Sequence, residues 1–289
     1  MILSEAYESY EQDKRLEGYS PFTLKSYRIQ AKLLIRHLGD VGIADVTDMQ
    51  LKQYLISQSA HLKPASLAHR VKFIRALFRW ATDNGHVLRN PSIALKEPKM
   101  GTRIPKAMSE EDMELLRESC TTKLEHAIVE MLYTTGCRLG EVAGLNRADI
   151  SWGDRSVVVR GKGDKEREVY FTAKCEIWLK WYLKSRTDDH PALFVTEREF
   201  GIAGEERGPR RMSRDQIRYI LKRVAERGEI ETNVYPHKLR HSYATHLLNN
   251  GAPLEAIQSF FGHAKLETTR IYADLSGERR RELYKKYFK

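Results

Sequence analysis

The residues of this sequence that could do chemistry are arginines, histidines, a lysine and a tyrosine, found in separate short stretches. HKLRH follows Pro236, and a helix beginning there would place His237, Arg240 and His241 on one face. Imidazole and guanidinium groups near a helix N-terminus can bind a phosphate. A solvated basic face is the commoner use of such residues. A metal site is the rarest, because no HExxH glutamate or other third ligand accompanies the histidines.

Arg138 lies in TGCRLGEVAGL, residues 135–145, just beyond a glycine. The stretch is expected to join an apolar helix that ends near Tyr133 to another helical segment. An arginine at such a junction often only caps helix carbonyls. Glu141, one turn later, could hold the guanidinium or form an ordinary surface pair. From this stretch alone, Arg138 could be either a helix cap or a functional side chain.

Lys162 is expected at the tip of a β-hairpin, in the sequence GKGD at 161–164. The flanking glycines allow positive φ, and the lysine would project outward. Most lysines at such tips only keep strand edges soluble. The stretch is not a P-loop, because the GxxxxGK[ST] pattern is absent.

His263 and Tyr272 end the series, in FGHAKLETTRIY at 261–272. At about 100° per residue they would lie on opposite sides of one unbroken helix, so they could share a site only if the chain bends. Gly262 is expected to cap a helix, and a second helix could begin near Leu266 or Glu267. A bend is therefore compatible with the sequence.

The composition limits the class of protein. With 289 residues, of which 41% are hydrophobic, the chain is long enough for two packed domains. Its formal net charge of +10 favours polyanionic partners, nucleic acid before an anionic membrane surface. No signal-peptide pattern or membrane-spanning apolar run is visible, so a soluble, cytoplasmic protein is expected. The cysteines, Cys120, Cys137 and Cys175, are odd in number and lack CxxC spacing, so no disulfide framework or cysteine zinc site is expected.

The first expected domain, residues 1–96, reads as helical throughout. Ser20 before Pro21 marks one helix start, and Thr47 marks another. The stretch from 66 to 83 separates an apolar face from a basic one, which meets solvent or phosphate. The basic residues are Lys72, Arg75 and Arg79.

A second domain, residues 108–289, is expected after a linker at 97–107, where EPKMGTRIPKA combines prolines, a glycine and basic residues without apolar periodicity. Ser109 should open its first helix. SVVVRGKGDKEREVYF predicts the hairpin, ALFV at 192–195 predicts a short strand, and the remainder reads as helical. The expected fold is mostly α, with a small antiparallel hairpin or sheet in the second domain.

These stretches, taken in their order along the chain, resemble the tyrosine recombinases and integrases. TGCRLGEVAGL is similar to the first arginine box of that family, HKLRHSYATHLLNNG to its HxLR box, and FGHAKLETTRIY to its LGH box leading to a nucleophilic tyrosine. GKGDKER lies where the family has its hairpin lysine, and this stretch is most similar to that of the Xer branch. Phe261 replaces the leucine of LGH, and Gly140 slightly weakens the helix after the arginine.

The resemblance implies a catalytic mechanism on a DNA phosphodiester without metal, cofactor or ATP. Two arginines, Arg138 and Arg240, would grip the non-bridging oxygens, and His263 would add a hydrogen bond. His237 would accept the proton of the nucleophile Tyr272, whose unperturbed pKa is about 10. Lys162 would protonate the departing 5′-oxygen, and the product would be a 3′-phosphotyrosyl link.

The resemblance also implies an assembly. A helical SAM-like core-binding domain and an α+β catalytic domain would form a clamp around duplex DNA, with the basic face of residues 66–83 against the phosphates. The protein would act as a tetramer on two sites with inverted-repeat half-sites. The C-terminal helix, 278–289, would dock on a neighbouring protomer, with folding back on its own domain as the alternative.

The expected task is site-specific recombination that resolves chromosome or plasmid multimers. Two alternatives keep the chemistry, namely integration of a mobile element and relaxation of supercoils as a type IB topoisomerase. A third is a DNA-binding protein without catalysis, which the intact set of residues disfavours.

Overall fold

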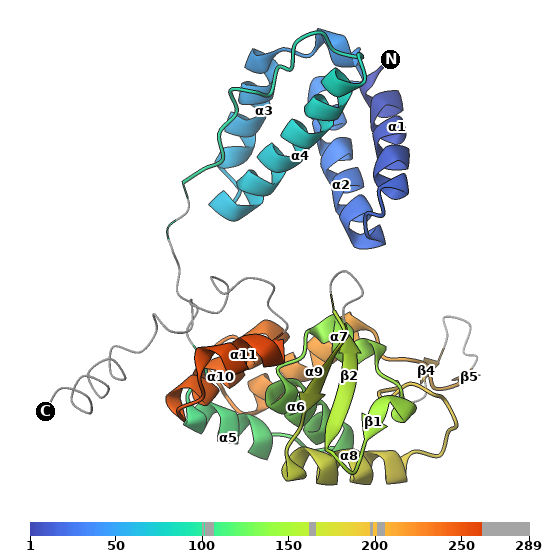
Figure 1. Ribbon diagram of the computed structural model, residues 1–289, viewed down its shortest axis with the longest axis vertical. Helices are drawn as coiled ribbons and strands as arrows, with labels where there is room; N and C mark the ends of the chain where they lie inside the picture. The colour runs from blue at the N-terminus through green and yellow to red at the C-terminus, as the bar shows by residue number, and fades with distance from the viewer. Residues whose placement is uncertain (100, 102–106, 162–165, 197–198, 201–205, 262–289) are drawn as a thin grey trace, which may run out of the picture. The chain divides into compact units, whose positions relative to one another are not determined.

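The computed structural model describes residues 1–99, 101, 107–161, 166–196, 199–200 and 206–261 (Figure 1). The chain divides into two compact units, Met1–Thr102 and Arg103–Lys289. The division lies inside the segment 97–107, where the sequence places a linker. None of the helices in the described ranges is both long and apolar enough to span a bilayer.

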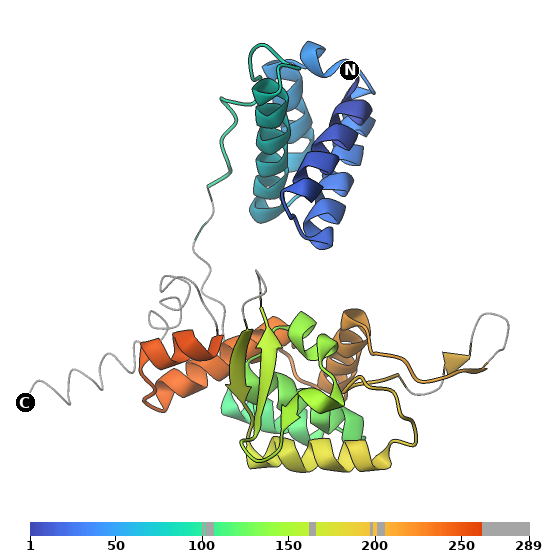
Figure 2. The same ribbon diagram turned by 45° about the vertical axis from the view of Figure 1, so that its right-hand side comes forward.

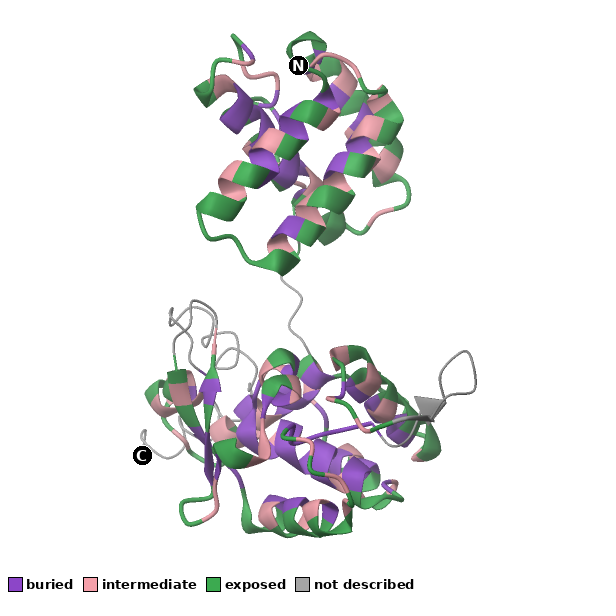
Figure 3. Ribbon diagram, turned by 90° about the vertical axis from the view of Figure 1, so that its right-hand side faces the viewer, coloured by how far each residue is buried: buried purple, intermediate pink, exposed green. Residues whose placement is uncertain are grey.

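The first unit is built from helices that pack side by side around one core (Figures 1 and 3). Ser20 accepts a hydrogen bond from the backbone N–H of Thr23, and Thr47 accepts one from that of Gln50, so both predicted helix starts are confirmed. The helices are α1 (Leu3–Leu16), α2 (Pro21–Leu38), α3 (Asp48–Ser59) and α4 (Pro64–Asp83), with a 3₁₀ turn at Ile43–Asp45.

Helix α4 has the two faces that the sequence predicts. Its apolar side chains Val71, Ile74 and Phe78 are buried in the core of the first unit. The basic residues on the other face are exposed, and they are Lys72, Arg75 and Arg79. Burial of one apolar stripe is what holds such a helix to the core, and it leaves the basic stripe at the surface.

The second unit combines helices with a small sheet. Its helices are α5 (Glu110–Glu118), α6 (Lys123–Thr135), α7 (Leu139–Gly144), α8 (Ala173–Ser185), α9 (Arg214–Arg227), α10 (Pro236–Asn249) and α11 (Leu254–Phe261), with a 3₁₀ turn at Arg147–Asp149. The strands β1 (Ile150–Ser151), β2 (Ser156–Arg160) and β3 (Glu166–Tyr170) form an antiparallel sheet in that order (Figure 2). Val157 pairs with Val169 and Arg160 with Glu166, so the predicted hairpin is confirmed.

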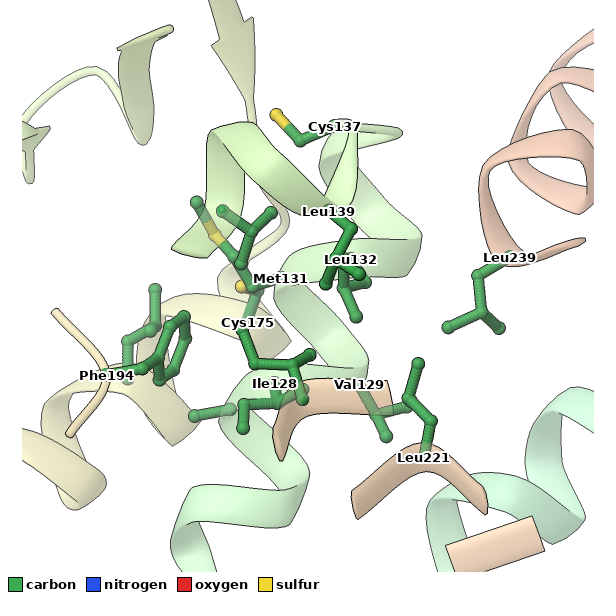
Figure 4. Packing of buried hydrophobic residues seen from close by; sticks show 14 of the residues in the cluster. Ile128, Val129, Met131, Leu132, Cys137, Leu139, Cys175, Phe194, Leu221 and Leu239 are labelled. Carbon is green, nitrogen blue, oxygen red and sulfur yellow. The ribbon is translucent and has the colours of Figure 1, made fainter. Parts of the chain in front are cut away.

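Helix α6 forms the centre of the second unit. Its residues Ile128, Val129 and Leu132 are no more than 1% exposed, and α8, α9 and α10 all pack against it. Figure 4 shows Val129 beside Leu221 of α9, and Leu239 of α10 belongs to the same hydrophobic cluster. A helix that is apolar over most of its circumference is stable only when it is surrounded in this way. The segments that leave the end of α6 are therefore placed by a rigid core.

Two of the sequence-based predictions for the second unit are wrong. Residues 192–195 do not form a strand, because Ala192 and Val195 each make only an isolated bridge, to Asn146 and to Arg211. The segment is apolar because it is buried, and a short apolar run does not by itself distinguish a strand from other buried chain. The following region is not entirely helical, because β4 (Glu199–Phe200) pairs with β5 (Glu206–Arg207).

Candidate active site

Arg138 lies between α6 and α7 and forms the N-cap of α7. Its backbone N–H donates to Oε2 of Glu141 at 2.7 Å, and its Nη1 donates to Oε1 of the same carboxylate at 2.9 Å. The Glu141 side chain is 5% exposed, whereas that of Arg138 is 36% exposed. Glu141 is therefore buried and holds the guanidinium of Arg138, which is partly exposed to solvent. The pair of Arg138 and Glu141 is not an ordinary surface ion pair.

Gly136 makes the turn that leads to Arg138. Its φ of 59° lies in the left-handed region, which glycine adopts without strain. A Cβ at this position would lie 2.6 Å from Cδ1 of Tyr243, whose ring stacks on that of Phe261 at a centroid distance of 5.7 Å. Both the backbone conformation and the close packing against α10 therefore require a glycine here.

Arg240 lies on α10 and is buried, with 5% of its surface exposed. Its Nη1 donates to the carbonyl of Gly136, and its Nη2 donates to the carbonyl of Phe261 at 2.9 Å. The guanidinium carbon also lies 4.1 Å from the centroid of the Phe261 ring. A solvated basic face is thus excluded for Arg240. This side chain joins the end of α6, the start of α10 and the end of α11.

His237 begins the same helix, one turn before Arg240. His237 is exposed at the surface. Desolvation by the neighbouring protein and the positive charges of Arg240, Arg138 and Arg218 nevertheless lower its pKa from the ordinary value of about 6.5. The imidazole is therefore neutral at pH 7 and able to accept a proton. Arg240 lies one turn after His237 and bonds to the carbonyl of Gly136, two residues before Arg138, so the three residues come from adjoining segments of the fold.

Arg167 of β3 also belongs to this cluster, and the sequence analysis missed it. Its Nη1 and Nη2 donate to the two oxygens of Glu141 at 2.9 and 2.7 Å, and its Nε donates to the carbonyl of Phe260 at 3.2 Å. The alternation of β3 could have identified it, since Arg167 shares a strand face with the buried Val169. An arginine on the inward face of a strand needs a buried partner.

Burial alone would raise the pKa of Glu141. The hydrogen bonds from Arg167 and from the backbone of Arg138 outweigh that effect and lower it, so the carboxylate is ionised. Its two oxygens together accept four hydrogen bonds, from Arg138 and Arg167. Within the cluster, Glu141, Arg138 and Arg167 thus form a group of two guanidinium groups around one carboxylate, and these three side chains carry a net charge of +1.

Several predicted site residues lie outside the described residues. They are Lys162, His263 and Tyr272, together with the expected bend after Phe261 and the C-terminal helix at 278–289. The basic residues Lys72, Arg75 and Arg79 are described, and they belong to the first unit. Within that unit Lys72 pairs with Glu97 at 3.3 Å, and Arg79 lies 4.0 Å from Asp83.

The cysteines and histidines give no sign of a metal site in the described chain. Cys120, Cys137 and Cys175 are buried and unpaired, and burial raises the pKa of the Cys137 thiol to about 11. No group of three or more potential ligands among the described residues is arranged to hold a metal ion. His241, four residues after His237, is 6% exposed.

A helical unit, a second unit with a small antiparallel sheet and a cluster of arginines with a neutral histidine define a class of DNA strand transferase. The phage integrase family matches residues 101–279 of this chain, which therefore belongs to that family. It is a site-specific tyrosine recombinase of the Xer type.

Two relatives illustrate the similarity in sequence. Tyrosine recombinase XerC of Oceanobacillus iheyensis is 36% identical over 276 residues, which cover 92% of this chain and 90% of the relative. Tyrosine recombinase XerD of Ralstonia nicotianae is 32% identical over 284 residues, with coverage of 93% and 88%.

Solved structures agree on the fold. The crystal structure of XerA recombinase is 28% identical, with a TM-score of 0.56 over 99% of both chains. The Tn1549 transposon integrase in complex with a circular intermediate DNA is 16% identical and has a TM-score of 0.76 over 99% of both chains. At 16% identity, the similarity to the transposon integrase shows a shared fold.

Proposed function

We propose that Arg138, Arg240 and His237 form the described part of the recombinase active site, and that Lys162, His263 and Tyr272 complete it. The observation that carries the proposal is the burial of Arg240 between the carbonyls of Gly136 and Phe261. It joins the arginine box, the HxLR box and the end of α11, which directly precedes Gly262 and His263 in the sequence. The side chain of Arg240 thus connects three segments that are far apart in the sequence.

The proposed reaction is attack of the Tyr272 phenol on a DNA phosphorus. The O–P bond to tyrosine forms as the P–O5′ bond breaks, which leaves a 3′-phosphotyrosyl link and a 5′-hydroxyl. His237, neutral at pH 7 because its pKa is lowered, accepts the phenol proton. Lys162 supplies the proton of the leaving oxygen. Arg138 and Arg240, with His263, stabilise the negative charge that builds up on the non-bridging oxygens.

A nicked suicide substrate tests this assignment. Wild-type protein should accumulate a covalent protein–DNA adduct on a denaturing gel, because the nicked fragment diffuses away and the reverse step is lost. Tyr272→Phe should bind the same DNA and form no adduct. An adduct with Tyr272→Phe, or cleavage that requires a divalent ion, would contradict the assignment.

We propose duplex DNA with inverted-repeat half-sites as the substrate. Crystal structures exist of a lambda integrase dimer bound to a COC' core site and of a tetramer bound to a Holliday junction, both with the same fold. The net charge of +10 and the exposed basic face of α4 support a DNA clamp. An enzyme with this substrate works in the cytoplasm, where chromosomal and plasmid DNA are found.

The proposed assembly is a tetramer on two DNA sites, linked through residues 278–289. Removal of everything after Gly277 should then abolish recombination between two sites while DNA binding persists. If the shortened chain recombined at the wild-type rate, subunits would not be linked through this segment.

The biological task that we propose is resolution of chromosome or plasmid multimers. It is supported by the identity of 36% and 32% to proteins named XerC and XerD. A plasmid with two directly repeated copies of the natural site should be resolved into two circles. Relaxation without resolution would indicate a topoisomerase, and a natural site at the end of a mobile element would indicate an integrase.

A further inference from the structure

We infer that Arg167 is a positioning residue of the recombinase active site. It neutralises Glu141, so that Arg138 presents its positive charge to the phosphate, and it ties the end of α11 to the hairpin. The inference rests on the proposed function, because it assumes that Arg138 contacts the scissile phosphate.

The guanidinium of Arg167 is held by protein oxygens. Its side chain is 11% exposed, and three of its N–H groups point at protein oxygens, two on Glu141 and one on Phe260. All three nitrogens of this guanidinium are thus engaged with protein oxygens. Arg167 therefore acts through the residues that it touches.

The negative charge of Glu141 opposes the positive charge of Arg138. Glu141 holds Arg138 at the correct place, but its negative charge would cancel that of Arg138 at a phosphate nearby. The carboxylate is buried, and charges interact more strongly in such surroundings than in water. Arg167 supplies a second positive charge to the same carboxylate, and the three side chains together carry a net charge of +1. Glu141 can then orient Arg138 without weakening its attraction for the phosphate.

The end of α11 also depends on Arg167. The last carbonyls of a helix have no partner within the helix. Here the carbonyl of Phe260 accepts from Arg167, and that of Phe261 accepts from Arg240. Two arginines from different elements, β3 and α10, thus hold consecutive carbonyls. The last turn of α11, which precedes the LGH-like box in the sequence, is therefore fixed by both of them.

Loss of the Arg167 charge and loss of its packing have different consequences for the rate of adduct formation. Arg167→Gln should slow adduct formation on the nicked substrate by at least about 10-fold at saturating DNA, the size typical of residues that orient a ligating group. The double variant Arg167→Gln with Glu141→Gln should be faster than Arg167→Gln alone. It removes the carboxylate charge that Arg167 no longer balances, and the cluster returns to a net charge of +1.

Arg117→Gln is the matched control. The Arg117 side chain is 15% exposed. It forms a bidentate ion pair with the buried Glu130 of α6 rather than with Glu141. Its loss removes a comparable buried pair from the same unit but should leave the rate of adduct formation near that of wild type. Arg167→Lys, which keeps the charge but cannot form a bidentate ion pair, should lie between Arg167→Gln and wild type.

The inference is overturned if Arg167→Gln forms adduct at the wild-type rate, or if Arg117→Gln slows the reaction equally. It is also overturned if the double variant is no faster than Arg167→Gln. Each variant is compared at saturating DNA and below its own melting temperature, so a loss of stability does not mimic a loss of rate. Failure of the proposed function has a different signature, namely an adduct that persists in Tyr272→Phe.

Discussion

The guanidinium of Arg240 stacks 4.1 Å from the ring centroid of Phe261 and donates a hydrogen bond to the carbonyl of the same residue. One arginine thus satisfies the polar end of α11 and packs on its last aromatic side chain. Because Arg240 also bonds to Gly136, the loop before Arg138 and the end of α11 are held by a single side chain. The predictions below depend on this arrangement.

Arg240→Lys should slow adduct formation by roughly 10²- to 10³-fold, as expected when a donor to the transition state is lost. An ammonium is a single point of charge, and it cannot reach both carbonyls and stack on the ring as the planar guanidinium does. Single-turnover cleavage of the nicked substrate measures the effect. Arg223→Lys, the same change at an exposed arginine of α9, should cleave at the wild-type rate. A mild defect in Arg240→Lys would argue against a direct role at the phosphate.

Gly136→Ala should lower the free energy of unfolding by about 2 to 4 kcal/mol, from backbone strain and overpacking combined. The new Cβ would meet the Tyr243 ring at 2.6 Å, at a φ of 59°. Gly144→Ala is the control, because nothing lies within 4 Å of a Cβ there and its φ is not positive. Denaturant unfolding of both variants measures the difference. Equal stability of the two would show that the turn at Gly136 has room for a side chain.

The rate of adduct formation should fall as the pH is lowered through the pKa of His237. That pKa is lowered in the folded protein, so the histidine is neutral and able to accept a proton above it, and charged below it. The acidic limb should therefore have its midpoint below about 6.5, the ordinary value for histidine. His237→Gln should be slow at all pH values and lack this limb. An unchanged limb in His237→Gln would assign it to another group.

Arg75→Gln should weaken DNA binding and make it less dependent on salt. Each phosphate contact contributes about 0.9 to the slope of log affinity against log salt, so the slope should become shallower by about that amount. Arg75 is exposed on the basic face of α4. Lys52→Gln on α3 removes one charge from the same unit, where Lys52 pairs with Asp48, and should leave the slope unchanged. Equal effects of the two changes would mean that only net charge matters.

Much of the fold follows from local patterns. The caps at Ser20 and Thr47 are hydrogen bonds to residues only three positions away, and such signals can be read directly from the sequence. Two short runs rich in β-forming residues around a Gly-Lys-Gly sequence predict the hairpin, and the two-faced pattern predicts that α4 buries Val71 and exposes Arg75. These features depend on neighbours along the chain.

The strand wrongly expected at 192–195 and the missed role of Arg167 both depend on distant parts of the chain. The run at 192–195 is buried beside Asn146 and Arg211, and its conformation is set by those two partners rather than by its own composition. Arg167 was overlooked because its partners, Glu141 and Phe260, are 26 and 93 residues away. Nothing in the hairpin sequence identifies them.

The sequence by itself determined the reactive residue types, their order and their resemblance to the tyrosine recombinases, because short motifs preserve spacing along the chain. Only the tertiary structure decided which groups hold one another. The bond between Arg240 and Gly136 spans 104 residues, and the bonds of Glu141 to Arg167 join a helix to a strand. A hydrogen bond requires two atoms at the right distance and angle, and for residues so far apart in sequence only the packing of the surrounding core brings those atoms together.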